Sequence, residues 1–202
     1  MGEKHSSTKD RILQAARDEF AAKGPDGARV DEIARRAGVN KERLYAHVGS
    51  KDKLFRAVLE QAFADIARYD EQLLALGEQD LPRLPLAVLE HNMRYLEQAP
   101  HFWRLLAWEN LGGGRHASTL PDFRQRGYEH LRRLYRLGQK RGLYRADASF
   151  ETFILLLTAG SFFYESNRQT MSRSLGRDLS DARERRKFLR ESGRLLGPGN
   201  PR

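Results

Sequence analysis

The sequence predicts an all-α fold, and three observations support that prediction. Apolar residues recur three and four positions apart through most of the 202-residue chain, as they do on one face of a helix. No stretch shows the alternation of apolar and polar residues that is typical of a half-buried strand. Proline and glycine separate the periodic segments, and 40% of the residues are hydrophobic, which suffices for a buried core.

Two segments near the N-terminus predict helices that pack together. The first ends at Gly24–Pro25, and its apolar face is formed by Ile12, Leu13, Ala16 and Phe20. The second is short, and its apolar face is formed by Val30, Ile33, Ala34 and Ala37. Ala34 and Gly38 are small and four positions apart, so a neighbouring helix can cross closely there.

A three-residue turn, residues 38–40, leads from the second helix to a third over Lys41–Val48. Gly38 suits the left-handed backbone that ends a helix, and Asn40 is a good N-cap for the next one. On the third helix Leu44 and Val48 face inward, which leaves its other faces exposed. Two short helices joined by such a turn are typical of a helix-turn-helix that binds DNA.

A fourth helix begins after Gly49 and Ser50, which end the third helix and cap the new one. Lys51 lies in its first turn, where backbone N–H groups already favour a phosphate. Periodicity extends this helix to about Leu76. The remaining predicted helices run from Pro82 or Pro85 to Leu96, from His101 to Leu111, from Leu120 to Gly142, from Phe150 to Met171 and from Ser180 to Leu195. The glycines at 112–114 predict a flexible linker.

The strings IARRAGV (33–39), K-x-x-LY-x-H (41–47) and GSKDKLF (49–55) at this spacing resemble the TetR family of bacterial transcriptional regulators. The resemblance covers about Thr8 to Leu59. It implies a three-helix helix-turn-helix DNA-binding domain over residues 1–55 and a helical ligand-binding and dimerisation domain over residues 56–202. It also implies a homodimer that forms through the two C-terminal helices and binds a palindromic operator in double-stranded DNA.

Candidate DNA contacts lie on the third helix and beside it. They are Arg29, Lys41, Glu42, Arg43, Tyr45, Ala46, His47 and Lys51. The Arg43 guanidinium matches O6 and N7 of guanine, and Glu42 could accept from a cytosine amine. The alternative is a solvated Glu42–Arg43 pair with phosphate contacts only.

For Tyr45, His47 and Lys51 the resemblance implies phosphate contacts. The alternatives are a packed tyrosine, a capping histidine and a solvated lysine. Ala28 and Arg29 stand where the family usually has a Thr or Ser pair, so the usual hydroxyl cap is missing. Arg29 could replace its phosphate contact with a charge-assisted one.

The resemblance also implies a small-molecule effector for the second domain. Aromatic and thioether side chains suited to an apolar or planar compound are Met93, Phe102, Trp103, Leu106, Trp108, Tyr128, Phe162 and Phe163. Each of them could equally be a core residue. Glu109 is expected to pair with an arginine of the basic helix at 120–142, with a cationic ligand as the alternative. The sequence thus favours a repressor released by a hydrophobic or aromatic ligand, and the alternative is a DNA-bound protein-interaction factor without an effector.

Composition excludes several other classes of protein. The net charge is +9 and the pI about 10.0, but the basic excess lies mainly in residues 124–145 and 173–202, where solvated helix faces explain it best. The absence of cysteine excludes disulfides and thiolate chemistry. The longest apolar run, Phe153–Leu157, is too short to span a bilayer, and we expect a cytoplasmic protein without membrane contacts. We find no catalytic or cofactor motif and no metal-ligand spacing, so we expect neither an enzyme nor a bound metal or cofactor.

Overall fold

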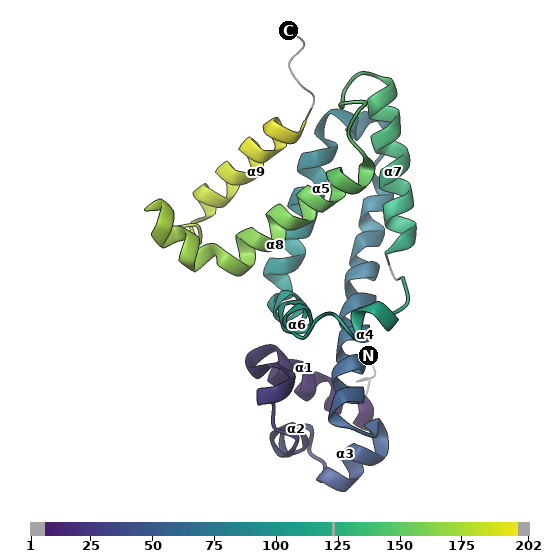
Figure 1. Cartoon of the computed structure of the whole chain (residues 1–202), viewed down its shortest axis with the longest axis vertical. Helices are drawn as coiled ribbons and strands as arrows, with labels where there is room; N and C mark the ends of the chain where they lie inside the picture. The colour runs from purple at the N-terminus through teal and green to yellow at the C-terminus, as the bar shows by residue number, and fades with distance from the viewer. Residues whose placement is uncertain (1–6, 123, 198–202) are drawn as a thin grey trace, which may run out of the picture. The chain divides into compact units, whose positions relative to one another are not determined.

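The computed structural model describes residues 7–122 and 124–197, and these residues form helices joined by short turns, without a strand (Figure 1). The α-helices are α1 (Thr8–Gly27), α2 (Val30–Ala37), α3 (Lys41–Val48), α4 (Lys51–Asp70), α5 (Leu84–Gln98), α6 (Pro100–Leu111), α7 (Gln125–Lys140), α8 (Phe150–Leu175) and α9 (Ala182–Leu196). Short 3-10 segments are Glu71–Ala75, Glu78–Arg83 and Ala117–Thr119. The predicted all-α fold is confirmed.

The chain packs as two compact units. The first contains α1, α2, α3, the part of α4 up to Asp65, and Pro100–Pro121. The second contains Ile66–Ala99 and the chain from Asp122 onward. By this packing α6 joins the helix-turn-helix, although the sequence assigns it to the second domain. The domain boundary at residue 55 stays a prediction.

In the first unit α1 packs against both α2 and α6. Phe20 of α1 and Phe55 of α4 are fully buried, and their ring centroids lie 5.1 Å apart in an edge-to-face arrangement. Gly24 has φ +72° and breaks α1 just before Pro25, where the sequence predicts the end of the helix. A Cβ atom at Gly24 would lie 2.8 Å from the Trp108 ring, so only glycine allows α6 to pack this closely.

In the second unit α5 packs against α8 and α9, while α7 packs against α8 and the two 3-10 segments that precede α5. The core contains Leu84, Val88, Leu89, Met93, Leu131, Leu134, Tyr135, Phe150, Phe153 and Leu157. The Tyr135 ring stacks on the Phe153 ring with centroids 4.4 Å apart. No helix in the described ranges combines the length and apolar character needed to cross a membrane.

Two helices are shorter than the periodicity predicts. α4 ends at Asp70, and Glu71–Ala75 continues as a 3-10 segment, although the sequence extends the helix to about Leu76. α7 begins at Gln125 instead of Leu120, because Leu120 precedes Pro121 and has an extended backbone with ψ 146°. In both cases the apolar spacing continues beyond the point where the backbone leaves the α-helical conformation.

Candidate DNA-binding surface

The turn between α2 and α3 has the geometry that its residues predict. Gly38 is in the left-handed region, with φ +67°, and its N–H donates to the carbonyls of Ala34 and Arg35. The Asn40 side chain accepts from the Arg43 N–H at 2.8 Å and thereby caps α3. Leu44 is fully buried and anchors α3 to the unit, while Val48, which the sequence also places inward, is half-buried. Because Leu44 is the buried residue of α3, most of the surface of this helix is accessible to solvent.

The eight predicted DNA contacts all have accessible side chains. Tyr45 and Lys51 are half-buried, and the other six are exposed, namely Arg29, Lys41, Glu42, Arg43, Ala46 and His47. Six of the eight lie on α3 itself, so this helix presents a continuous accessible surface. Such a surface combines donors and acceptors for base edges with cations for phosphates.

A buried carboxylate holds the start of α2, where a hydroxyl cap is missing. Arg29 is the N-cap residue, and its side chain makes no capping hydrogen bond. Instead its backbone N–H donates to Oε1 of Glu19 in α1 at 3.3 Å. Glu19 also accepts from Lys23 Nζ at 2.7 Å, and its Oε2 lies 3.8 Å from the Arg36 guanidinium. α1 therefore caps α2 through a side chain that is only 1% exposed.

The sequence interpretation did not single out Glu19. The sequence does contain an indication that Glu19 is buried, because it lies between the apolar positions 16 and 20 of α1 and therefore on the buried side of the helix. Burial by itself raises the pKa of this carboxyl, but the hydrogen bonds from Lys23 and Arg29 and the charges of Lys23 and Arg36 lower it more, so the net shift is downward. Glu19 is therefore a charged group inside the unit.

Salt bridges tie down several cations around α2 and α3. Glu32 accepts from Arg35 and Arg36, and these hydrogen bonds lower its pKa to about 2. Lys41 Nζ lies 3.0 Å from Asp31 Oδ1, a contact that raises the pKa of Lys41. A phosphate near Lys41 would share or compete for an ammonium group that already contacts the exposed Asp31 carboxylate.

Two hydrogen bonds fix the N-terminal end of α4, where the sequence predicts a phosphate contact. Ser50 Oγ accepts from the Lys53 N–H at 3.1 Å. Lys51 Nζ donates to the Asp26 carbonyl at 3.2 Å, which holds the lysine beside the end of α1. The positive end of the helix dipole and this ammonium group would both attract an anion.

Family models match both parts of this chain. The model described as bacterial regulatory proteins, tetR family, matches residues 12–58, which include α2, the turn and α3. The model described as tetracyclin repressor-like, C-terminal domain, matches residues 86–194. This chain belongs to the TetR family. It is a DNA-binding regulator of transcription and not an enzyme.

Full-length relatives agree with the TetR assignment. The transcriptional repressor NicS of Pseudomonas putida is 35% identical over 188 residues, which cover 90% of this chain and 87% of NicS. The repressor SCO4008 of Streptomyces coelicolor is 33% identical and covers 76% of each chain. The crystal structure of SCO4942 from Streptomyces coelicolor has a TM-score of 0.71 at 24% identity, covers 95% of this chain and 99% of that one, and shows a common fold.

The predicted ligand-binding residues of this TetR-family chain fall into both units. Those of the first unit, all on α6, are Phe102, Trp103, Leu106 and Trp108. Those of the second unit are Met93, Tyr128, Phe162 and Phe163. Met93 is fully buried in the core of the second unit, and Tyr128 packs against that core. Phe163 is 53% exposed and lines a surface groove between α8 and α9.

Next to Tyr128 the second unit contains a cluster of buried and half-buried polar side chains that the sequence interpretation missed. Asp70 is buried at the end of α4, with His91 Nε2 at 2.9 Å from its Oδ1 and Arg124 Nε at 2.6 Å from its Oδ2. The Arg124 guanidinium lies over the Tyr128 ring, 4.8 Å from its centroid. Burial raises the pKa of Tyr128. Tyr128 therefore has polar as well as apolar neighbours.

The expected pairing of Glu109 with an arginine of the basic helix is wrong. Glu109 is 2% exposed, and its Oε1 accepts from the backbone N–H groups of His116 and Ala117 at 2.6 and 2.9 Å. Its Oε2 lies 2.9 Å from His116 Nδ1. The partner comes from the loop that follows α6, because the glycines at 112–114 turn the chain back onto the helix.

Proposed function

We propose that this protein is a homodimeric repressor that binds a palindromic operator through α3 and is released by a small hydrophobic or aromatic ligand. The accessible surface of α3 between two anchored ends carries this proposal. The cap at Asn40 and the N-terminal end of α4 hold α3 on both sides, so its exposed side chains are presented on a rigid element. A recognition helix of this kind enters the major groove.

Different side chains of this surface serve different contacts. Arg43, the third residue of α3, is exposed and donates in the fork geometry that guanine accepts, and Glu42 accepts from cytosine. Tyr45, His47 and Lys51 contact phosphates and set the register of the helix on the duplex. Arg29 and Lys41 add phosphate contacts at the other end of the motif, and the small Ala46 allows close approach of a base.

The dimer forms through α8 and α9. Leu155, Leu156 and Phe163 are each more than half exposed on α8, and their spacing places them on one side of the helix. α9 has no buried residue, and its core-facing side chains Phe188, Leu189 and Leu196 are only partly buried within one chain. A second copy that covers these helices would remove this apolar surface from water.

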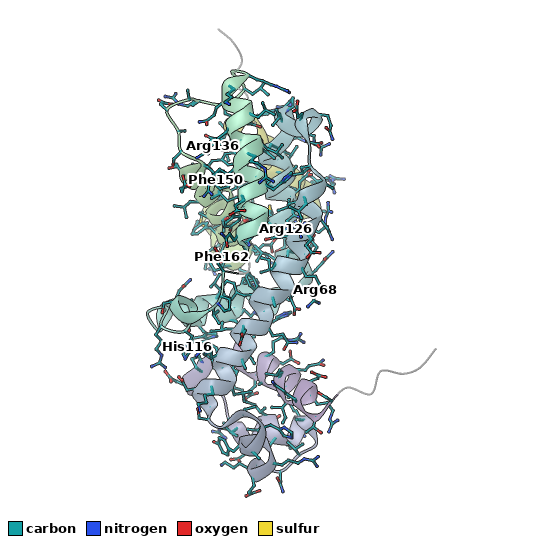
Figure 2. All side chains as sticks on the ribbon, turned by 90° about the vertical axis from the view of Figure 1, so that its right-hand side faces the viewer. Arg68, His116, Arg126, Arg136, Phe150 and Phe162 are labelled. Atoms are coloured by element: carbon teal, nitrogen blue, oxygen red, sulfur yellow. The ribbon has the colours of Figure 1, made fainter. Side chains whose placement is uncertain are left out.

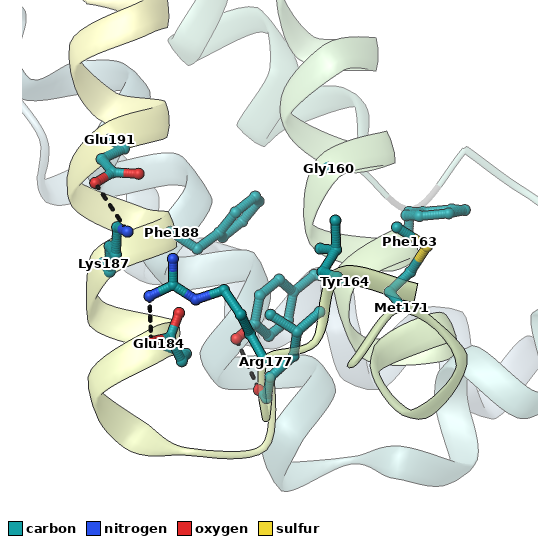
Figure 3. A pocket seen from close by; sticks show the side chains of 11 residues that line it. Gly160, Phe163, Tyr164, Met171, Arg177, Glu184, Lys187, Phe188 and Glu191 are labelled. Carbon is teal, nitrogen blue, oxygen red and sulfur yellow. Dashed lines mark hydrogen bonds and ion pairs between the residues drawn. The ribbon is translucent and has the colours of Figure 1, made fainter. Parts of the chain in front are cut away.

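The groove between α8 and α9 lies next to this surface and has a volume of about 360 Å³ (Figure 3). Its apolar lining comes from Phe163, Tyr164, Met171, Leu175, Leu179 and Phe188. Ion pairs between Arg177 and Glu184 and between Lys187 and Glu191 occupy its rim, so the charged groups there already have partners. These features suit a side chain from a second copy of the protein.

Repression follows from the same geometry, because a dimer that covers a promoter blocks polymerase without a further contact. The relatives NicS and SCO4008 are both named as repressors. For the effector, the observation in favour is the mixed environment of Tyr128, where the Phe150 ring and the Arg124 guanidinium both face its ring. A planar compound with one polar group matches such surroundings.

A second candidate is a DNA-bound protein-interaction factor without an effector. The observation in its favour is the packing of the second unit. Met93 is fully buried in the core, and the groove between α8 and α9 includes neither Met93, Tyr128 nor Phe162. A domain that is packed around these residues would need to open before it accepts a ligand.

Fluorescence anisotropy with DNA fragments from around the coding locus tests DNA binding. The wild type is expected to bind one fragment selectively, with an affinity that falls as salt rises. Lys51→Ala is expected to weaken binding to all fragments and to lower the slope of log affinity against log salt by about 1. Lys140→Ala, an exposed lysine of α7, serves as the matched control and should leave both quantities unchanged. The absence of selective binding by the wild type would contradict the proposal.

The effector is tested by adding a panel of small aromatic and aliphatic compounds to the preformed complex. Release by one compound, and loss of that response in Tyr128→Ala with DNA affinity retained, would support the ligand-responsive repressor. Selective DNA binding that no compound disturbs would favour the protein-interaction factor.

A further inference from the structure

The loop after α6 brings a histidine against the phosphate-binding end of α4. We propose that His116 is a positioning residue for DNA binding, which acts by neutralising Asp52 so that the N-terminal end of α4 attracts a DNA phosphate. This inference rests on the proposed phosphate contact at Lys51. All groups involved belong to the first unit, and His116 is labelled in Figure 2.

The His116 ring lies between two carboxylates. Its Nδ1 is 2.9 Å from Glu109 Oε2, and its Nε2 is 3.0 Å from Asp52 Oδ1. A neutral imidazole has one N–H group and can donate to one carboxylate only, whereas an imidazolium donates to both. The geometry therefore matches a positively charged ring, and this charge faces Asp52.

The rest of the loop fixes the ring in this place. Glu109 binds the backbone of the loop as well as the ring, and the Phe55 ring packs edge-to-face against the imidazole with centroids 5.4 Å apart. Gly113 and Gly114 have φ of +86° and +71°, a conformation that side-chain-bearing residues rarely adopt. The glycines thus form the turn that returns His116 to the helix end, rather than the flexible linker that the sequence predicts.

Asp52 would otherwise compete with DNA for the same helix end. It lies in the first turn of α4 directly after Lys51, and 62% of its side chain is exposed. A carboxylate there is favoured by the helix dipole, and it repels an incoming phosphate. His116 contacts the Asp52 carboxylate, and the Arg115 guanidinium lies 3.5 Å from the same oxygen. With an imidazolium at position 116, the charges of Asp52, Glu109, His116 and Arg115 sum to zero, so the loop after α6 offsets the negative charge of Asp52.

A glutamine substitution tests whether the positive charge of His116 matters for DNA binding. His116→Gln keeps a hydrogen-bond donor but removes the positive charge. We expect it to bind DNA about two- to fivefold more weakly at low salt, with the loss shrinking as salt rises. Asp52→Asn keeps an oxygen acceptor but removes the negative charge, so we expect it to bind DNA at least as tightly as the wild type.

The double variant His116→Gln/Asp52→Asn distinguishes neutralisation of Asp52 by His116 from a purely structural role of His116. If His116 acts by neutralising Asp52, His116→Gln has almost no effect on DNA affinity in the Asp52→Asn background. An equal loss in both backgrounds would overturn the proposal, and so would weaker binding by Asp52→Asn alone or full affinity of His116→Gln. If His116→Gln does not fold, Asp52→Asn still carries the test.

Two further variants complete the experiment. His130→Ala is the control histidine, because its ring contacts the Leu76 carbonyl within the second unit, and DNA affinity should not change. Lys51→Ala reports on the phosphate contact itself. If Lys51→Ala binds DNA like the wild type, the contact in the proposed function is wrong and the role of His116 falls with it. A loss for Lys51→Ala without the charge coupling of positions 52 and 116 would refute the role of His116 alone.

Discussion

Glu19→Ala removes the buried carboxylate that caps α2 and thereby tests whether α1 holds the helix-turn-helix in place. The variant leaves the Arg29 N–H without its partner at 3.3 Å, which costs about 1–3 kcal/mol if that group stays buried. Removal of the side-chain methylene below the carboxylate adds about 0.8 kcal/mol. The pairs with Lys23 and Arg36 contribute little, because both cations are about half exposed and return to water. We therefore expect a loss of roughly 2–4 kcal/mol in the free energy of unfolding.

Urea unfolding followed by circular dichroism measures this loss. With a slope of about 2 kcal/mol per molar urea, the midpoint should fall by about 1–2 M. Glu60→Ala, an exposed carboxylate on α4, is the control and should leave the midpoint unchanged. A midpoint for Glu19→Ala equal to that of Glu60→Ala would refute the reasoning.

The difference in unfolding free energy between the wild type and Glu19→Ala should also depend on pH, which gives an independent check. The lowered pKa of Glu19 means that its ionised form is stabilised in the folded protein. This contribution is fully present above the ordinary value of 4.5 and is lost as the pH falls through the lowered pKa of the folded state. The stability difference between wild type and Glu19→Ala should therefore narrow below about pH 4.5.

Three further substitutions test other parts of the structure. Arg43→Ala should relax base preference at a single operator position by about 1–3 kcal/mol, measured with a panel of single-base operator variants, and a uniform loss across the panel would instead indicate a phosphate contact. Phe163→Glu places a charge on the exposed surface of α8 and should yield monomers in light scattering, whereas Leu111→Glu, an equally apolar exposed site on α6, should remain dimeric. Gly38→Ala forces a side chain into φ +67° and should lower stability by about 1–2 kcal/mol in thermal unfolding. An unchanged melting temperature would mean that the turn relaxes without strain.

The helix-turn-helix could be predicted from sequence because its signals are local. Gly38 and Asn40 act within four residues of their own positions, and the apolar stripe of α2 needs one short segment only. The all-α fold and the order of the helices follow from the same short-range periodicity. The predicted C-terminal end of α4 and the predicted N-terminal end of α7 were less accurate. The α-helical backbone ends at Asp70, and Pro121 disfavours a helical backbone at Leu120, although the apolar spacing continues at both places.

Interactions between distant residues could not be predicted in this way. Glu19 and Arg29 are ten positions apart, and Asp52 and His116 are 64 positions apart. Their roles depend on which helices pack together. Sequence periodicity places Glu109 on a helix, but it cannot show that the following glycines return His116 to that helix. The sequence interpretation therefore gave Glu109 the wrong partner.

α4 belongs to both compact units, and an aspartate near each of its ends is bound by a histidine from another element. Asp52 contacts His116 in the first unit, and Asp70 contacts His91 in the second. Asp70 is buried and also contacts the Arg124 guanidinium, whereas Asp52 is mostly exposed. Loss of a partner is more costly for a buried charge than for an exposed one, because water can replace the missing contact only at the surface. The C-terminal end of α4 should therefore change its partners only in a cooperative rearrangement of the second unit, whereas loss of the His116 contact at the N-terminal end should cost little folding stability and should be measurable mainly as weaker DNA binding.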